Sequence, residues 1–332
     1  MMRRLINDGY DVVEEMTQGY VKAHPDYVKM HPEDDRVVLS NMMSKEPRVR
    51  IIFGGGTGHE PLFLGYVGKN GADAAVLGNV NTSPSPEPIY NSAKATDSGK
   101  GVLYLFGNYS GDIMNFEMGI EMAEDDGIQA DYVAVRDDVV SSEEFEERRG
   151  VAGDIMVLKA AVAAAAKGLS LEEVKAVAEH ANRNTFSMGV ALSSATLPVT
   201  GKPIFHMDEG DMEIGMGIHG EPGIERKPLK TANEVIDEIM TNIFDRTDLG
   251  KGDKVHVLVN GLGALPLMDQ YICFNRVSQV LEEKGLSIEK SLVGNYATSM
   301  DMIGMSVTLT RLDDDLRDYL TYPMDTPYLK VN

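Results

Sequence analysis

Short apolar runs alternate with helical patterns along this chain, and this alternation restricts the fold more than any other feature of the sequence. In the first half, apolar runs typical of strands lie at residues 49–53, 74–77, 102–106 and 132–135. Helical patterns lie at residues 86–96, 113–125, 155–167 and 171–182. Runs that are apolar at nearly every position suit strands covered on both faces. The first half therefore predicts an α/β domain in which helices flank a mostly parallel sheet.

The second half is richer in strands. Its strand patterns lie at residues 189–196, 212–218, 254–260, 287–294 and 305–310, and its helical patterns at residues 232–244 and 265–284. A chain of 332 residues is long enough for two domains. We therefore predict two α/β domains, residues 1–184 and residues 185–332, the second of them a strand-richer mixed α/β domain.

Charge and hydropathy exclude two classes of partner. The chain has 31 Lys and Arg against 52 Asp and Glu, so its formal net charge is −21. Binding to a phosphate backbone needs a surplus of Lys and Arg, so we expect no nucleic-acid partner. The longest unbroken apolar run, residues 160–166, is far shorter than the roughly 18 residues that indicate a membrane span. We therefore expect no membrane association.

The N-terminal region and the cysteine content predict a cytoplasmic protein. Asp8 and Asp11 interrupt the N-terminal region before the apolar segment of an export signal forms. Cys273 is the only cysteine in the sequence, which excludes an intramolecular disulfide and a Cys-rich metal site. We predict that the chain itself holds no metal.

The loop GGGTGHEP, residues 54–61, follows a predicted strand and is expected to open a helix, where backbone N–H groups hold anionic or polar ligands. A Walker loop would end in Gly-Lys-Ser or Gly-Lys-Thr, and this loop has no lysine. The dinucleotide fingerprint requires a third glycine where the chain has His59. The loop therefore predicts a polar ligand site but matches neither nucleotide-binding motif.

A second glycine loop keeps an alternative function open. The strand pattern VHVLVN, residues 255–260, is followed by GLGALP and a helical pattern, with Glu282 and Glu283 where a ribose-binding acid would lie. Pro266 replaces the third glycine of the dinucleotide fingerprint. We therefore keep a nicotinamide-dependent oxidoreductase as an alternative.

Two of the seven histidines are candidates for chemistry. His59 and His219 each lie in a glycine loop after a predicted strand, and a Glu-Pro pair follows each of them closely. His59-Glu60 does not begin a zinc-protease motif, because Phe63 occupies the position of the second histidine.

Two further loops offer polar groups at strand ends. Asp112 lies in the loop GNYSGD, where it is either the N-cap of the next helix or a base that accepts a proton from a substrate hydroxyl. Ser83 lies in the hydroxyl-rich loop NTSPSP. Together with the two histidines, these loops predict a small polyhydroxy ligand.

Several ordered motifs resemble those of the dihydroxyacetone kinase family. They are GGGTGHEP, TSPSPEP, GNYSGDIMNFE, RRGVAGD, GIHGEPGIER and NYATSMDMIGMSVTL. The resemblance runs from about Arg4 to the last residue and is to the dihydroxyacetone-binding subunit of the DhaK type, which depends on the phosphotransferase system.

The resemblance implies a role for each candidate residue. His219 would attack the ketone carbonyl of dihydroxyacetone and hold the substrate as a covalent hemiaminal. His59 would hydrogen-bond the substrate and assist proton transfer, and Asp112 would accept the proton of the hydroxyl that is phosphorylated. The implied substrate-binding positions are Gly55, Gly56, Thr57, Gly58, Ser83 and Gly107.

The resemblance also implies partner proteins. The chain has no Walker loop, so ADP and Mg²⁺ are expected on a nucleotide-binding subunit of the DhaL type, and we expect no cofactor in this chain. Phosphoenolpyruvate would be the ultimate donor, through a phosphoprotein of the DhaM type. The chain would be inactive alone and would form a homodimer.

One departure from the family pattern keeps the substrate open. The family's loop usually begins with lysine, as KNYTGD, and this chain has Gly107 there. The missing side chain leaves space for a ketose with one more carbon, such as erythrulose. A DhaQ-like paralogue that senses dihydroxyacetone and coactivates transcription is a further alternative, since it would also keep His219.

Overall fold

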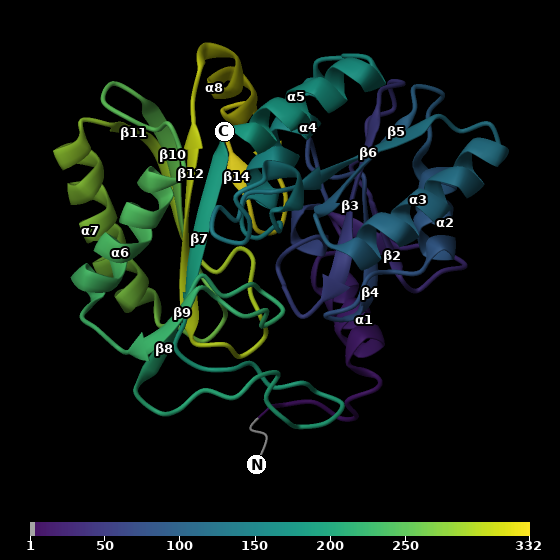
Figure 1. Cartoon of the computed structure of the whole chain (residues 1–332). Coiled ribbons are helices and arrows are strands. Elements are labelled where there is room, and N and C mark those ends of the chain that lie inside the picture. The colour runs from purple at the N-terminus through teal and green to yellow at the C-terminus, as the bar shows by residue number, and fades with distance from the viewer. Residues whose placement is uncertain (1–3) are drawn as a thin grey trace.

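Two six-stranded sheets organise residues 4–332, the part of the chain that the computed structural model describes (Figure 1). The first sheet has the order β1-β2-β4-β3-β5-β6 and consists of β1 (Val28–Met30), β2 (Val37–Ser40), β3 (Arg50–Thr57), β4 (Ala74–Val80), β5 (Val102–Gly107) and β6 (Ala130–Val135). β4, β3, β5 and β6 run parallel, whereas β1 and β2 are antiparallel additions at one edge. The predicted mostly parallel sheet is confirmed.

Helices cover both faces of the first sheet. α2 (Pro86–Thr96) and α3 (Ser110–Asp125) pack on one face, and α4 (Asp154–Ala166) and α5 (Leu171–Arg183) pack on the other. Each face has its own apolar core, and the central strands supply side chains to both. Burial of both faces explains why the sequence of these strands is apolar at nearly every position.

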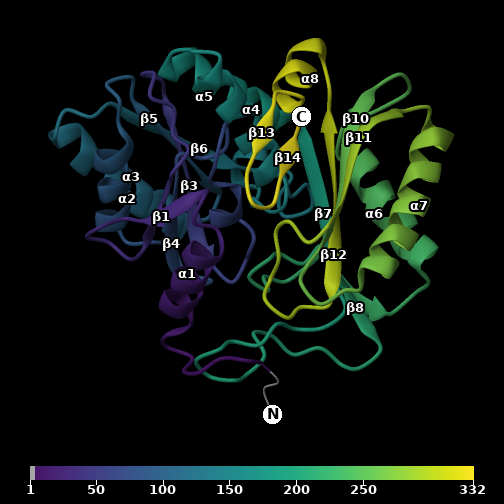
Figure 2. The same cartoon turned by 180° about the vertical axis from the view of Figure 1, so that it is seen from behind.

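The second sheet has the order β11-β10-β12-β7-β8-β9. It consists of β7 (Thr185–Ala191), β8 (Asp211–Ile214), β9 (Glu225–Pro228), β10 (Lys254–Gly261), β11 (Ser287–Gly294) and β12 (Gly304–Arg311). Only β10 and β11 pair in parallel, so the sheet is mixed as predicted. α6 (Ala232–Asp245) and α7 (Leu267–Lys284) cover its outer face (Figure 2).

α4 lies between the two sheets and is buried on all sides. Residues 154–165 are all buried, because the Ala-rich sequence of this helix offers no polar face to solvent. The inner face of the second sheet carries buried hydroxyl pairs, with Ser187 Oγ 2.7 Å from Thr308 Oγ1 and Thr185 Oγ1 3.1 Å from Thr310 Oγ1. These pairs satisfy polar groups that burial would otherwise destabilise.

The C-terminal segment returns to the first half of the chain. α8 (Asp314–Leu320) packs on α4, and Lys159 of α4 donates hydrogen bonds to the carbonyls of Tyr319 and Tyr322. β13 (Met324–Asp325) pairs with β14 (Lys330–Val331), and Lys69 bridges to Asp325. Leu316, Leu320 and Leu329 therefore belong to a core that residues of the first sheet also build. The predicted division at residues 184 and 185 falls at the first residue of β7.

Helix positions agree closely with the sequence prediction, whereas several strand bounds differ. The strand predicted at residues 189–196 is β7, which ends at Ala191, and the one predicted at 212–218 is β8, which ends at Ile214. The sequence analysis did not predict α1 (Val12–Ala23), α8, or the short strands β1, β2, β9, β13 and β14.

The glycine-rich loop also differs from its prediction. The strand predicted to end at residue 53 continues as β3 through the three glycines to Thr57. No α-helix opens after it, and a single 3₁₀ turn, η1 (Leu64–Tyr66), follows. The expectation of a helix N-terminus at this loop is therefore wrong. Parallel pairing of Gly54 and Gly55 with β4 extends the strand past the point where local glycine preference would end it.

Two helical glycines test the packing of α2 against α3. A Cβ at Gly119 of α3 would lie 2.5 Å from Ile89 Cγ2 of α2, whereas a Cβ at Gly19 of α1 would meet nothing within 4 Å. We predict that Gly19→Ala raises the free energy of unfolding by about 0.5–1 kcal/mol through helix propensity alone. Gly119→Ala is predicted to lower it by about 1–3 kcal/mol, because overpacking outweighs the same gain. Urea denaturation measures both values, and equal stabilisation by the two substitutions would refute the close contact.

Candidate active site

Loops from both halves of the chain meet where β3 and β5 end. These two strands are adjacent and parallel, so the segments that carry His59 and Asp112 leave the sheet at the same edge. His219 comes from the loop between β8 and β9 of the second sheet. The structure thus brings together the three side chains that the sequence analysis assigned to chemistry. They lie at the carboxyl ends of the strands, where α/β folds bind their ligands.

His59 is buried and held in one tautomer. Its side chain is 1% exposed, and Nδ1 lies 2.7 Å from the carbonyl oxygen of Thr298. Since a carbonyl oxygen only accepts hydrogen bonds, Nδ1 carries the proton and Nε2 has the lone pair. Burial, together with the nearby His219, lowers the pKa of His59 to about 3. His59 Nε2 is buried with no hydrogen-bond partner among residues 4–332, so it is a free acceptor at the site.

The loop of His59 is joined to a loop of the second half by several hydrogen bonds. The N–H of Thr298 donates to the carbonyl of His59 over 3.1 Å, and the N–H of Met300 donates to the carbonyl of Gly58 over 2.8 Å. The hydroxyl of Thr298 donates to the carbonyl of Glu60 over 2.8 Å. These bonds fix the position of the His59 loop relative to the second sheet.

His219 lies against two aromatic rings. Its ring centroid is 4.7 Å from that of His59 and 4.5 Å from that of Tyr109, both in edge-to-face geometry. The hydroxyl of Tyr109 donates to the carbonyl of Gly150 over 2.9 Å, which fixes the tyrosine ring. Glu221 also contacts His219, and its Oε1 lies 2.9 Å from His219 Nδ1. The imidazole of His219 is therefore held on several sides.

Asp112 is buried without a complete set of partners. It is 8% exposed, and its Oδ1 has no hydrogen-bond partner in the part of the chain that the structure describes. Burial raises the pKa of Asp112 to about 6, against the opposing effects of Ser83 and His219. A carboxylate with a raised pKa is a stronger base than an ordinary aspartate, and at neutral pH it is still largely ionised.

The structure corrects one interpretation of Asp112. α3 begins at Ser110 and its N-cap is Tyr109, so Asp112 is the third residue of the helix and not its N-cap. The polar side chain of Asp112 is therefore not used to cap the helix, and it lies on the buried side of α3.

The predicted substrate-binding glycines lie where chain segments approach closely. A Cβ at Gly55 would lie 2.8 Å from Phe63 Cε2, and one at Gly56 would lie 2.7 Å from the backbone nitrogen of Thr82. Gly58 has a φ of +97° and donates its N–H to Glu60 Oε1 over 3.0 Å. Gly56 therefore lets the hydroxyl-rich loop after β4 pack on the end of β3, which brings the residues of that loop toward the site, whereas Gly55 makes room for Phe63.

Other predicted positions lie around the same edge. Thr57 donates its hydroxyl to the carbonyl of Gly78 over 3.2 Å, and Ser83 lies beside the first turn of α3, 3.9 Å from where a Cβ of Gly111 would be. Gly107 ends β5, and a Cβ there would lie 3.0 Å from Tyr109 Cε2.

The sequence analysis missed three residues that contact the two histidines: Tyr109, Glu221 and Thr298. A signal for Glu221 was present, because a Glu-Pro pair follows each candidate histidine. Thr298 lies 239 residues from His59 in the sequence, so no local pattern could reveal their contact.

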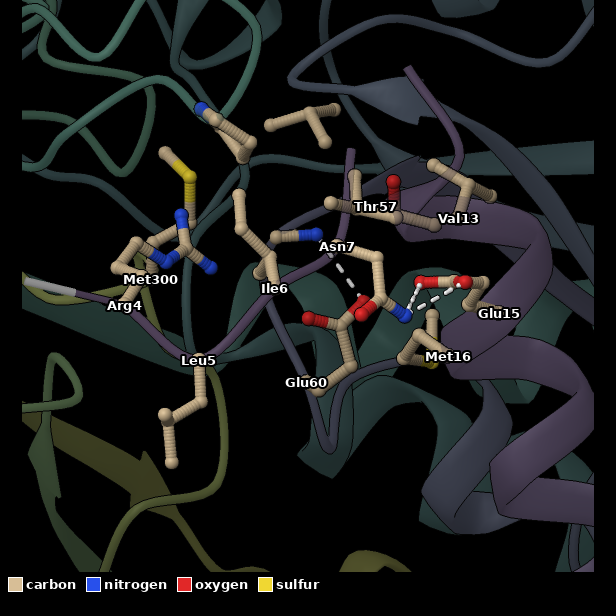
Figure 3. A pocket seen from close by; sticks show the side chains of 14 residues that line it. Arg4, Leu5, Ile6, Asn7, Val13, Glu15, Met16, Thr57, Glu60 and Met300 are labelled. Atoms are coloured by element: carbon tan, nitrogen blue, oxygen red, sulfur yellow. Dashed lines mark hydrogen bonds between the residues drawn. The ribbon is translucent and has the colours of Figure 1, made fainter. Parts of the chain in front are cut away.

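A cavity of about 550 Å³ borders the His59 loop (Figure 3). Thr57, Gly58 and Glu60 of the loop line it together with Met300 and residues of the N-terminal segment, including Arg4. His59 and His219 are not among its lining residues. Arg4 donates to the carbonyl of Thr196 over 3.1 Å, so the N-terminal segment reaches from the first half of the chain to the second.

Two other kinds of feature are absent from residues 4–332. Among residues 4–332, no cluster of three or more His, Cys, Asp or Glu side chains has the arrangement to hold a metal ion. No helix in this part of the chain combines the length and apolarity needed to cross a membrane.

Comparison with known proteins identifies the class of protein. The family model of the Dak1 domain matches residues 18–328. The chain is 66% identical over 331 residues to the dihydroxyacetone-binding subunit DhaK of PTS-dependent dihydroxyacetone kinase 2 from Listeria innocua, with both chains fully covered. It is 41% identical to an L-erythrulose kinase of Pectobacterium atrosepticum and covers 56% of that protein.

Comparison with solved structures leads to the same family as the sequence comparison. The dihydroxyacetone kinase of C. freundii superposes with a TM-score of 0.92 at 30% identity, over the whole of this chain and 61% of that one. The dihydroxyacetone kinase operon co-activator DhaQ superposes with a TM-score of 0.88 at 32% identity, over 96% of this chain and 99% of that one.

These similarities define an α/β protein of the Dak1 class. The chain belongs to the dihydroxyacetone kinase family, and within it to the DhaK-type subunits, as its motifs indicated. Its relatives are named as dihydroxyacetone kinase subunits, which are phosphotransferases, so the alternative of a nicotinamide-dependent oxidoreductase is set aside.

The buried state of His59 predicts a dependence of stability on pH. Its pKa is about 3 in the folded chain and roughly 6.5 when unfolded, so the unfolded chain binds the proton first as the pH falls. Stability is therefore lost below about pH 6.5, by up to about 1.4 kcal/mol per pH unit. We predict that His59→Asn removes this contribution. As the pH falls from 6.5 to 5, the free energy of unfolding of the variant should therefore decrease by about 2 kcal/mol less than that of the parent.

The exposed His206 supplies the control, since His206→Asn is expected to leave the slope unchanged. Urea denaturation at each pH gives the values. Parallel pH profiles for the parent and His59→Asn would contradict the neutral, buried state of His59.

Proposed function

We propose that the chain is the dihydroxyacetone-binding subunit of a PTS-dependent dihydroxyacetone kinase, and that His219 holds the ketone covalently during phosphorylation. The observation that carries the proposal is the convergence of His219, His59 and Asp112 at one strand edge, with buried acceptor atoms of His59 and Asp112 that have no partner among residues 4–332. Unsatisfied buried polar atoms are costly, and a polar ligand is the simplest way to satisfy them.

Capture of the ketone uses the lone pair of His219. Nε2 forms a bond to the carbonyl carbon, and the π electrons of the C=O bond move to oxygen. The resulting alkoxide takes a proton from solvent, and the ring keeps its Nδ1 proton as an imidazolium. The adduct is a hemiaminal whose single positive charge corresponds to the one proton taken from solvent. Glycerol has no carbonyl group, so this step selects the ketone over the corresponding polyol.

His59 and Asp112 have complementary roles in this scheme. His59 Nε2, which has no proton, accepts a hydrogen bond from a substrate hydroxyl. Asp112 accepts the proton of the hydroxyl that reacts, as that oxygen bonds to phosphorus and the bond from phosphorus to the donor oxygen breaks. Alignment of the hydroxyl by the covalent bond to His219 supplies much of the remaining advantage, since phosphoryl transfer depends chiefly on position and charge.

The strand-end positions would surround the substrate. We assign the substrate-binding role to the backbone at Gly55, Gly56 and Gly58, and to the neighbouring positions Thr57, Ser83 and Gly107. Their support is their location around the ends of β3, β4 and β5, beside the two histidines.

The phosphoryl donor belongs to partner proteins in this proposal. A DhaL-type subunit would carry ADP and Mg²⁺, and a DhaM-type phosphoprotein would supply the phosphoryl group. The name of the Listeria relative, a PTS-dependent kinase subunit, supports such an assembly. Homodimer formation and a cytoplasmic location stay predictions, the latter supported by the single cysteine.

Capture and transfer are predicted to be separable. Asp112→Asn should still bind dihydroxyacetone covalently but transfer phosphate about 10²–10⁴-fold more slowly, because it removes the base. His219→Ala should lose both steps. Carbon-13 NMR with dihydroxyacetone labelled at C2 measures capture, as the carbonyl signal is replaced by that of a tetrahedral carbon. Turnover is measured with the partner subunits and phosphoenolpyruvate.

The exposed His206 provides a matched control, and His206→Ala should keep both steps. The absence of an adduct with the parent protein at saturating ketone would refute covalent capture. An adduct without turnover in the complete system would instead indicate a sensor, like the operon co-activator that shares this fold.

A second candidate function is phosphorylation of a four-carbon ketose. Gly107 favours it, because this chain lacks the long cationic side chain of the family loop at that position, and the similarity to an L-erythrulose kinase supports it. A lysine at this position would need the Tyr109 ring to shift, since its Cβ would lie 3.0 Å from Tyr109 Cε2.

We predict that Gly107→Lys changes the ratio of kcat/KM for dihydroxyacetone over erythrulose at least tenfold in favour of dihydroxyacetone, which corresponds to about 1.4 kcal/mol. The reconstituted system measures both substrates with the parent and the variant. An unchanged ratio would show that residue 107 does not set the size of the substrate.

A further inference from the structure

We propose that Glu221 is a positioning residue that keeps the proton of His219 on Nδ1 and so leaves Nε2 free to attack the ketone. This inference rests on the proposed role of His219. It concerns a residue to which the sequence motifs assigned no role.

Both carboxylate oxygens of Glu221 are committed to His219. Oε1 lies 2.9 Å from Nδ1 of the ring, and Oε2 accepts the backbone N–H of the same residue over 3.1 Å. An ionised carboxylate only accepts hydrogen bonds, so the Nδ1 atom must be the donor. A neutral imidazole has a single N–H, and its other nitrogen then carries the lone pair. The contact therefore selects the tautomer with a nucleophilic Nε2.

The neighbours of Glu221 keep it ionised. Burial alone would raise its pKa, but the hydrogen bond from His219, together with the Arg149 guanidinium, lowers the pKa of Glu221 to about 2. Arg149 is itself fixed, because it donates to Asp138 Oδ2 over 2.8 and 3.1 Å and to the carbonyl of Gly215 over 3.0 Å. Gly215 begins the loop that carries His219, so the hydrogen bond from Arg149 holds the start of this loop in place. The guanidinium of Arg149 also stabilises the negative charge of Glu221.

The loop backbone is shaped to allow this contact. A Cβ at Gly217 would lie inside contact distance of Glu221 Oε2 and 2.9 Å from Arg149 Nη1. Gly220 has a φ of +85° and donates its N–H to the carbonyl of Gly217 over 3.1 Å, which turns the chain back toward residue 217. The two glycines thus make the room and the turn that Glu221 needs to reach His219.

Two rings complete the confinement of the imidazole. His59 and Tyr109 meet the His219 ring in edge-to-face geometry, at interplanar angles of 75° and 80°. With the ring plane held by these neighbours and Nδ1 held by Glu221, the direction of the Nε2 lone pair is fixed.

Glu221 also suits the charge that develops during attack. As Nε2 bonds to the carbonyl carbon, the ring becomes an imidazolium whose positive charge is shared with Nδ1. The carboxylate beside Nδ1 stabilises that charge. Ser-His-Asp triads also contain a carboxylate that orients a histidine and stabilises its imidazolium form. In those triads, loss of the orienting carboxylate lowers kcat by about 10⁴.

The variant Glu221→Gln tests the inference. The amide is of similar size but offers N–H donors, so it favours a lone pair on Nδ1 and a proton on Nε2. We expect nitrogen-15 NMR of histidine-labelled protein to show that His219 changes tautomer, with the signals assigned by His219→Gln. We expect adduct formation with labelled dihydroxyacetone to slow at least 100-fold. Glu221→Asp, which keeps the charge, should recover part of the rate.

Glu225→Gln is the matched control, because it removes an exposed carboxylate four residues away that pairs with Lys227 and not with His219. It should change neither the tautomer nor the rate. An unchanged tautomer and rate in Glu221→Gln would overturn the proposal. If Glu221→Gln does not fold, Glu221→Asp decides alone: a parent-like tautomer with a slowed rate supports the proposal, and an unchanged rate overturns it. If the parent forms no adduct, the proposed function fails, while the tautomer measurement still tests the role of Glu221.

Discussion

The hydrogen bonds between residues 58–60 and residues 298–300 are the interaction on which the site depends. They join a loop of the first sheet to a loop of the second, and one of them fixes the tautomer of His59. His219 comes from the second half of the chain, so its distance from His59 is set by how the two halves are held together. A site that must hold a covalent substrate in line with an external donor needs this rigidity, since small displacements cost much of the rate.

The glycines near the site serve close packing more than flexibility. Gly55 and Gly56 lie in β3, where its register with β4 shifts, and their missing side chains make room for Phe63 and for the loop at Thr82. Gly217 makes room for Glu221 in the same way. The glycine-rich motifs therefore shape the site by letting other residues approach, and the approaching side chains carry the chemistry.

The sequence predicted the fold well where local signals and tertiary structure agree. α5 begins at Leu171 as predicted, because Ser170 and Glu173 form a capping box before an amphipathic segment. The sequence misled at residues 54–57, where glycines indicate a turn but pairing with β4 maintains a strand. Among the site residues, Asp112 and His59 could be placed together because parallel strands end at the same edge, whereas the contact of Thr298 with His59 depends on the tertiary arrangement alone.

The path of the C-terminal segment limits how the chain can be divided, by protein engineers or in evolution. After the last strand of the second sheet, the chain returns to the first half of the molecule. There, Leu316, Leu320 and Leu329 belong to the same apolar core as residues of the first sheet. Severing the polypeptide before β7 would strip this apolar surface from one fragment and leave it uncovered on the other. The two sheets therefore cannot be excised, shuffled or transplanted as independent modules, and changes in one half must be accommodated by the tail of the other.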